Sequence, residues 1–391
     1  MGWQRFRSGL QFVHLWAGLI LAIPIILIGV SGSIIIAMNV MTDHAPPSAP
    51  GRGPMHSMVD ILAAAQKAAP PGWPVAIIRM PSSIGEPASV QVGLPPGRRP
   101  EGGGGQNFVG ETIYMDPVSL QVLATAERRR AGPFMQGVTS MHIALMEPGH
   151  YGLQTVGFLG IAMVLFGFTG LVLWWPRRGQ WRHAFGVKRG ARGFRLNRDL
   201  HGAIGFWSLI VFLIISISGV DLAFPVTFQN AVGRVLSLKS GLTEGHVDAK
   251  VAATIRDKNA LTPDEAARVA LASVPNARVV QVQLPPRPDG IYMVTLVPRP
   301  FDDNAPQIST FIGPGPEMLD MVDPRDYSAG KQLLLWLRAL HYGHGLGEVW
   351  RGLVFLSGLL PLLFAITGLR MWQLKRAQRT QVPSALPQPA E

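Results

Sequence analysis

The chain has 391 residues, of which 48% are hydrophobic and only 15% are charged, and it contains no cysteine. Such a composition is too apolar for a soluble protein of this length, so we expect a polytopic membrane protein. The lack of cysteine excludes disulfides, thiolate metal sites, iron–sulfur clusters and cysteine nucleophiles. The net charge of +11 does not indicate nucleic-acid binding, because much of the excess lies beside apolar runs, above all in 177–198.

Four apolar runs are long enough to cross a bilayer as helices, since about 20 residues span the roughly 30 Å of the hydrocarbon core. The first run is too long for the core of a signal peptide, so we expect it to be retained as an anchor. The four spans are expected at about Phe12–Met38, Gln154–Trp175, His201–Phe224 and Val349–Trp372.

Basic residues are concentrated between the second and third runs, against the single acid Asp199, and again after the fourth run. By the positive-inside rule, this connection and both termini are expected in the cytoplasm, and two large segments outside it. The basic residues are Arg177, Arg178, Arg182, Lys188, Arg189, Arg192, Arg195 and Arg198 in the connection, and Lys375, Arg376 and Arg379 near the C-terminus.

The two large segments have the same order of features. Each has an apolar helical pattern, Val59–Ala69 or Thr262–Ser273, then strand-like runs and an Asp-Pro turn. The second helix begins with a capping signal, Thr262 followed three residues later by Glu265. The strand-like runs are Val75–Arg79, Ser89–Leu94, Glu111–Tyr114 and Leu120–Ala124, then Arg278–Leu284, Ile291–Val297 and Ser309–Ile312. We therefore expect two small α+β domains.

The apolar runs also repeat. His14–Gly32 and His201–Gly219 both open with histidine, carry glycine four residues later and close with Ser-Gly, and Thr-Gly-Leu recurs at Thr169 and Thr367. A duplication of span, domain and span places the two copies in parallel, with a pseudo-two-fold axis along the membrane normal. We expect the four spans to pack together as a four-helix bundle.

The predicted fold is thus an α-helical membrane protein, a four-helix transmembrane bundle from a tandem parallel repeat with two extracytoplasmic α+β domains. The expected parts are a first span at 1–40, a first domain at 41–152, a second span at 153–176, a basic cytoplasmic loop at 177–200, a third span at 201–225, a second domain at 226–347, a fourth span at 348–374 and a cytoplasmic tail at 375–391.

Four of the ten histidines have counterparts in the repeat. His14 and His201 are expected near the cytoplasmic surface, and His142 and His341 near the outer surface. Two imidazoles that face each other across a bundle commonly hold a b-type haem. The sequence therefore predicts two haem b groups, one per leaflet, with irons about 20 Å apart. Anchoring or hydrogen bonding is the alternative role for each single histidine.

Other residues are weaker candidates. His344, three residues after His341, is the alternative iron ligand, and Met141 and Met146 are less favoured. Asp221 is expected to be solvated or to cap a helix rather than to carry protons. Arginines that could pair with haem carboxylates are Arg198, Arg338 and Arg351. Histidines without a counterpart are His44, His56, His150, His183 and His246.

In combination, these motifs resemble the PepSY-associated transmembrane helix (PepSY-TM) family over about Val13 to Lys375, and the Asp-Pro turns with their preceding helices resemble its PepSY domains. The motifs are His14-x3-Gly18 with Ser31-Gly32, Leu200-His201 with Ser218-Gly219, His142 with Glu147-Pro148-Gly149, Trp174-Trp175-Pro176-Arg177-Arg178, and Leu340-His341 with Thr367-Gly368-Leu369.

The resemblance implies a multi-pass protein of the bacterial inner membrane with periplasmic PepSY domains, in a family that includes ferrisiderophore reductases with two haems b. We therefore expect transmembrane electron transfer to a periplasmic ferric siderophore or similar ferric chelate, with no catalytic acid–base residue. The cytoplasmic parts are too short for a flavin or nicotinamide domain, so membrane quinol or a flavin reductase partner would supply electrons. Membrane lipid is the other expected contact, and nucleic acid is not.

Two other functions fit the sequence. The protein could be a non-catalytic accessory or assembly subunit of a larger inner-membrane complex, with the PepSY domains as docking surfaces. It could also regulate a periplasmic peptidase, a role that only the domain family suggests.

Overall fold

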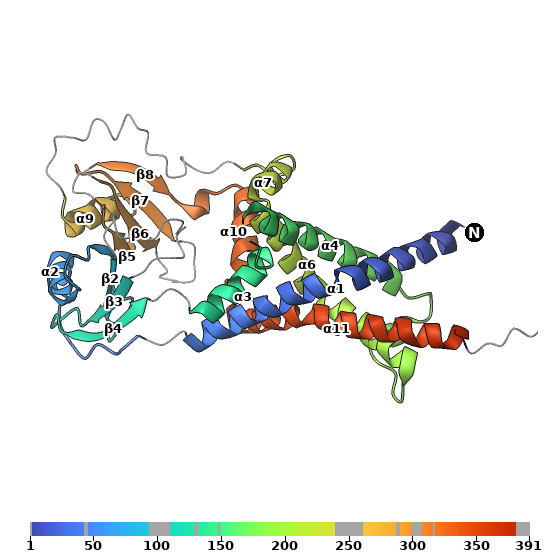
Figure 1. The fold of residues 1–391 in the computed structure, drawn as a ribbon. Helices are drawn as coiled ribbons and strands as arrows, with labels where there is room; N and C mark the ends of the chain where they lie inside the picture. The colour runs from blue at the N-terminus through green and yellow to red at the C-terminus, as the bar shows by residue number, and fades with distance from the viewer. Residues whose placement is uncertain are drawn as a thin grey trace, which may run out of the picture. The chain divides into compact units, whose positions relative to one another are not determined.

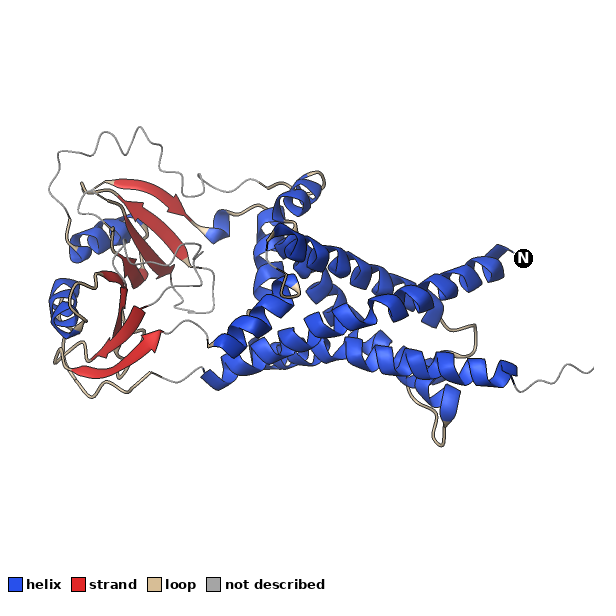
Figure 2. Cartoon of the chain, in the orientation of Figure 1, coloured by secondary structure: helices blue, strands red, loops and turns tan. Residues whose placement is uncertain are grey.

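The computed structural model describes residues 2–42, 46–93, 110–128, 132–147, 149–238, 261–286, 290–298, 307–315 and 317–380. The chain forms two compact units, one mostly helical and one built on a β-sheet (Figures 1 and 2). The helical unit combines Met1–Asp43, Pro133–Val235 and Leu333–Glu391, and the sheet unit combines His44–Gly132 and Leu236–Gln332. Each unit is therefore assembled from segments that are distant in sequence.

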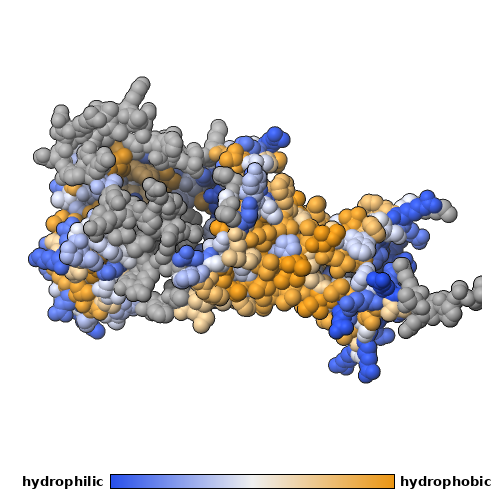
Figure 3. Space-filling view, in the orientation of Figure 1, coloured by the Kyte–Doolittle hydropathy of each residue, from blue (hydrophilic) through white to orange (hydrophobic). Residues whose placement is uncertain are grey.

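Four long helices make up most of the helical unit, and all four are long and apolar enough to cross a membrane, as predicted. Their apolar surface runs along the unit, and hydrophilic residues gather at the end that carries the N-terminus (Figure 3). Several helices extend beyond the predicted spans because flanking arginines are good helix formers that continue the helix. The helices are α1 (Gly2–Thr42), α4 (His150–Trp174), α6 (Gly193–Ala223) and α11 (Gly347–Thr380).

Helices α1 and α11 pack so closely that their backbones come into contact. Glycines at positions 29 and 358 face each other, and a methyl group added to either would overlap the carbonyl oxygen of the other. One turn along, Ser33 Oγ donates a hydrogen bond to the Phe355 carbonyl oxygen at 2.7 Å. Such small-residue contacts hold helices together where apolar burial gives no advantage over lipid.

Shorter helices complete this unit: α3 (Pro133–Ala144), α5 (Trp181–Ala184), α7 (Pro225–Gly233) and most of α10 (Ala329–His341). The expected parts 41–152 and 226–347 placed α3, α7 and α10 in the extracytoplasmic domains, whereas the structure groups them with the long helices. Helix α10 packs there because Leu340 lies against a buried cluster of Ile36, Trp350 and Val354. The indole nitrogen of Trp350 also donates to the Leu340 carbonyl oxygen at 3.0 Å.

All eight strands of the second unit belong to one antiparallel sheet with the order β4-β3-β2-β1-β5-β6-β7-β8. Every predicted strand is found: β1 has the predicted ends, and the others have shifted ends. Leu94, at the end of one predicted strand, lies outside the described residues, and β8 was not predicted. The strands are β1 (Val75–Arg79), β2 (Ala88–Gly93), β3 (Gly110–Met115), β4 (Val122–Arg128), β5 (Ala277–Gln283), β6 (Tyr292–Pro298), β7 (Ile308–Ile312) and β8 (Met318–Val322).

The strands of the two predicted domains thus share one sheet. Strand β1 pairs with β5 through 77–79 and 281–283, and Ile78 and Val282 lie opposite each other in that pairing and are fully buried. Helices α2 (Met58–Ala68) and α9 (Pro263–Ser273) contribute to the same hydrophobic core. Pairing the first strand of each half buries two strand edges that separate domains would expose.

The predicted capping box of α9 is confirmed, with Thr262 and Glu265 satisfying each other's backbone N–H groups. Asp264, in the first turn of α9, also accepts hydrogen bonds from the backbone N–H groups of Met58 and Val59, at 3.0 and 2.9 Å. A carboxylate is favourable at a helix N-terminus, where N–H groups lack partners inside the helix. One acid therefore connects the starts of α2 and α9.

Candidate functional site

His14 and His201 meet at one end of the helical unit, as the repeat predicted. His14 lies on α1 and His201 on α6, and their ring centres are 6.5 Å apart. The Nδ1 atom of His14 lies 2.8 Å from Thr169 Oγ1 on α4, and that of His201 lies 2.8 Å from Thr367 Oγ1 on α11. The four long helices therefore each contribute one residue to this site, which we call the His14–His201 pair.

His142 and His341 form a second pair, with ring centres 6.1 Å apart. They lie on the short helices α3 and α10 rather than at the starts of the spans. His142 Nδ1 is 2.9 Å from the Ile28 carbonyl oxygen of α1, and His341 Nδ1 is 2.8 Å from Ser218 Oγ of α6. His142 lies 27 residues before Thr169 (169 − 142) and His341 lies 26 before Thr367 (367 − 341), and this difference does not prevent their pairing.

The partners determine which imidazole nitrogen carries the proton. Thr169, Thr367 and Ser218 each donate their hydroxyl proton to a carbonyl oxygen of their own helix, at 2.7 to 2.9 Å, so each accepts from histidine. The Ile28 carbonyl oxygen can only accept. All four imidazoles therefore have Nδ1–H, which leaves the lone pair on Nε2. A ligand histidine is held in this way, with one nitrogen fixed and the other left for the metal.

Each ring also lies against a glycine. A methyl group built at Gly170 or Gly219 would lie 3.6 Å from Cε1 of His14 or His341, and at Gly368 it would lie 4.0 Å from Cε1 of His201. The approach at Gly32 is closer, because the methyl would lie 2.8 Å from Cε1 of His142. These glycines leave room for the imidazoles between packed helices.

The spacing of each pair fits two axial ligands of one iron. With iron–nitrogen bonds of about 2 Å and ring centres about 1 Å beyond each nitrogen, two ligating imidazoles have centres roughly 6 Å apart. Within the described ranges, no group of three or more His, Asp or Glu side chains could hold a metal ion.

The two pairs are well separated along the helices. His201 and Ser218 both lie on α6, 17 residues apart (218 − 201), which is about 25 Å at 1.5 Å per residue. This separation is close to the thickness of the hydrocarbon core. One pair accordingly lies toward each end of a span of membrane length.

A family model, described as the PepSY-associated TM region, matches residues 11–375. The chain belongs to this family. A search of curated proteins finds no match to it. As a PepSY-associated TM protein with four helices of membrane-spanning length, it is a multi-pass membrane protein.

The remaining candidates are not members of either histidine pair. His344 is exposed in the turn after α10, His183 is exposed on α5, and His56 lies 3.6 Å from Asp60 in the sheet unit. The side chain of His150 and all of His44 and His246 lie outside the described residues. Met146 is exposed, and Met141 is half-buried on α3, next to His142. Each candidate arginine contacts an acid: Arg198 contacts Asp199, Arg338 contacts Asp221 and Arg351 contacts Glu348.

Sequence reasoning missed the residues that hold the imidazoles. It matched Thr169 with Thr367 as part of the repeat, but assigned them no role. Phe166 and Phe364 lie one turn before these threonines, with ring centres 5.4 and 5.0 Å from His14 and His201. The recurrence of Phe-x-x-Thr-Gly at a constant offset was the signal available in the sequence.

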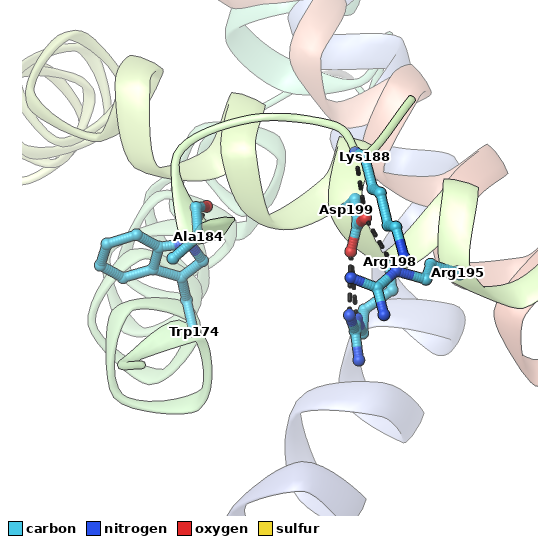
Figure 4. Close-up of polar contacts among 6 residues, drawn as sticks. All are labelled: Trp174, Ala184, Lys188, Arg195, Arg198 and Asp199. Atoms are coloured by element: carbon cyan, nitrogen blue, oxygen red, sulfur yellow. Dashed lines mark hydrogen bonds and ion pairs between the residues drawn. The ribbon is translucent and has the colours of Figure 1, made fainter. Parts of the chain in front are cut away.

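The basic connection between α4 and α6 is folded against the helices beside the His14–His201 pair. Trp174 Nε1 donates to the Ala184 carbonyl oxygen at 3.1 Å, and the Lys188 backbone N–H donates to Asp199 at 3.4 Å (Figure 4). Arg195 and Arg198 also contact the Asp199 carboxylate, at 3.4 and 3.0 Å. Asp199 is thus neutralised, and the other basic side chains of the connection give this end its positive charge.

Proposed function

We propose that this protein carries electrons across the bacterial inner membrane through two b-type haems, one at each histidine pair, and reduces a ferric siderophore or similar ferric chelate in the periplasm. The observation that carries the proposal is the pairing itself. Four histidines from four helices form two pairs, and all four have Nδ1 within hydrogen-bonding distance of a hydroxyl or carbonyl oxygen.

A tandem parallel repeat supports a two-centre function. Each half supplies one histidine to each pair, so neither pair forms within one half. The sheet shows the same correspondence between the two halves of the chain, because its strand order is symmetric about the β1–β5 pairing. Each histidine pair needs both halves of the chain, so we expect the two pairs to be retained together.

Orientation follows from charge. The connection beside the His14–His201 pair carries exposed arginines, and Asp199, its single acid, is already neutralised. By the positive-inside rule, this end and both termini lie in the cytoplasm. The His142–His341 pair then lies near the periplasmic surface.

The protein residues fix the sites rather than the chemistry. A bound haem would supply one-electron exchange at its iron. The threonines, Ser218 and the Ile28 carbonyl oxygen orient the imidazoles and keep Nε2 unprotonated, which a metal ligand requires. Transfer to an external chelate needs no acid–base residue, and reduction releases iron because hard oxygen donors bind ferric iron better than ferrous iron.

The donor and the acceptor need not enter the helical unit. Membrane quinol or a flavin reductase partner could deliver electrons at the His14–His201 end. The ferric chelate would collect them at the other end.

The test places purified, reduced protein in nanodiscs without oxygen and adds ferric chelates. Rapid reoxidation of the b-type absorption bands, together with trapped ferrous iron, is the expected result, and His142→Ala and His341→Ala should abolish it. His344→Ala is the matched control and should reoxidise at the normal rate. A protein without b-type bands, or with bands that no ferric chelate oxidises, would instead favour the accessory-subunit function.

A further inference from the structure

Asp221 on α6 is a fully buried carboxylate with half of its hydrogen-bonding capacity unused. Its relative exposure is 0%. Oδ2 accepts a hydrogen bond from Arg338 Nε of α10 at 3.0 Å, whereas Oδ1 is buried and has no hydrogen-bond partner among the described residues. Leaving a carboxylate oxygen unsatisfied away from water is costly. Ionisable residues within membrane spans are rare for that reason and commonly functional.

The position of Asp221 connects it to the His142–His341 pair. Two polar contacts join α6 to α10, Ser218 with His341 and Asp221 with Arg338. The members of each helix are three residues apart, so both contacts lie on the same faces, about one turn from each other. The buried carboxylate therefore interacts with a charge at the histidine pair more strongly than an exposed carboxylate would.

Arg338 differs from Asp221 in its access to water. Its side chain is 40% exposed, whereas that of Asp221 is 0% exposed. If Asp221 became neutral, water would still solvate the guanidinium, and the unsatisfied oxygen would no longer carry charge. The carboxylate is thus the buried side of the pair, and the guanidinium is the side that water reaches.

We propose that Asp221 is a proton-accepting site coupled to the His142–His341 site: it takes up one proton from water when one electron arrives there and releases that proton when the electron leaves. This inference rests on the function proposed above. An O–H bond forms at Oδ1 and is broken again on reoxidation, and the proton is exchanged with water on the Arg338 side. The added electron and the added proton cancel in charge, which lowers the cost of holding an electron in a low-dielectric site.

Few other ionisable groups lie on the elements around Asp221. Helix α10 brings Lys331 in its first turn, Arg338 and His341, α3 brings His142, and the start of α11 brings Glu348, paired with Arg351 at 3.1 Å. Helix α4 brings the exposed Tyr151 and also His150, whose side chain is not described. The sequences of α7 and of the outer half of α1 contain no charged residue. Asp221 is thus the buried acid next to the site.

The decisive measurement is the pH dependence of the midpoint potential at the His142–His341 site. In a His201→Ala background, the b-type bands that remain report this site alone. We expect the potential to fall as pH rises, with a slope approaching one proton per electron, and Asp221→Asn should remove the slope. Glu348→Gln removes an exposed acid of the same region and should keep it. An equal slope in Asp221→Asn would overturn the inference and leave the function intact, whereas a protein without b-type bands would overturn both.

A second measurement needs no variant that could misfold. Reduced-minus-oxidised infrared spectra of the unmodified protein should show a carboxylic acid C=O band that appears on reduction. Lack of this band would equally overturn the proton-accepting role of Asp221.

Discussion

Thr169 and Thr367 show how one hydroxyl can prepare a histidine for a metal. Each accepts Nδ1–H and donates to a helix carbonyl oxygen, so the tautomer and the ring direction are fixed together. Replacing Thr169 by valine keeps the shape and removes the acceptor. We expect about a 10-fold to 100-fold loss of haem affinity at the His14–His201 pair, as measured by titration of haem into the apoprotein.

The control for this variant is Ser208→Ala. Ser208 Oγ donates only to the Ile204 carbonyl oxygen of α6, so its removal should leave haem affinity unchanged. Equal affinity in Thr169→Val and in the unmodified protein would show that the hydroxyl does not prepare His14.

The glycines that lie against the imidazole rings give a second prediction. Gly32→Ala places a methyl 2.8 Å from Cε1 of His142, so the ring or α1 must shift, whereas Gly219→Ala places one at an ordinary 3.6 Å from Cε1 of His341. We expect Gly32→Ala to lower haem content at the His142–His341 pair and Gly219→Ala to keep it. The haem-to-protein ratio measures both, and equal ratios would show that the close approach at Gly32 is not limiting.

At the scale of elements, Asp264 couples two helices. Asp264→Ala leaves the N–H groups of Met58 and Val59 without their acceptor, at a cost of about 1 kcal/mol because water can partly replace it. Hydrogen exchange should therefore speed up in both α2 and α9. Thr262→Ala, which removes only the capping box of α9, should affect α9 alone. The same exchange pattern in both variants would contradict this coupling.

Asp116 predicts how the sheet unit responds to acid. Burial alone would raise the pKa of Asp116, but the backbone N–H groups of Val118, Gly51 and Ser119 outweigh it and hold the pKa below its usual value. A lowered folded-state pKa gives stability that is complete above the unfolded value of about 4 and is lost as pH falls below it.

We therefore expect the free energy of unfolding of the sheet unit to fall below about pH 4. Asp116→Asn should be less stable at neutral pH and less sensitive to acid, whereas Asp326→Asn, at an exposed site, should behave like the unmodified protein. Chemical denaturation, monitored by hydrogen exchange, tests this prediction. Undiminished acid sensitivity in Asp116→Asn would refute it.

Local elements were predictable where a local pattern determines them. Thr262 and Glu265 marked the start of α9, and a short run of apolar residues marked β1 at its observed ends, Val75–Arg79. Helices α3 and α10 were assigned to the soluble segments because a local pattern, even the amphipathic one of α10, does not show which part of the chain covers its apolar face. The β1–β5 pairing joins residues about 200 apart in sequence, and periodicity within each strand carries no information about such a partner.

For the molecule as a whole, the repeat in the sequence predicted the two histidine pairs, but it did not predict the residues that form hydrogen bonds with them. The matched positions of His14 with His201 and of His142 with His341 predicted which histidines belong together. The hydroxyl and carbonyl partners on neighbouring helices required the packed bundle. The two histidine pairs lie about 25 Å apart along α6, and in the proposed function an electron that crosses the membrane passes both.

Haem content in single histidine variants tests the two-site claim most directly. The unmodified protein should bind two b-type haems, and His14→Ala, His201→Ala, His142→Ala and His341→Ala should each bind one. His14→Ala and His201→Ala should keep the same haem, and the other two variants should keep the other, which their redox potentials distinguish. His344→Ala should bind two. Two haems in all four variants, or none in the unmodified protein, would contradict the account.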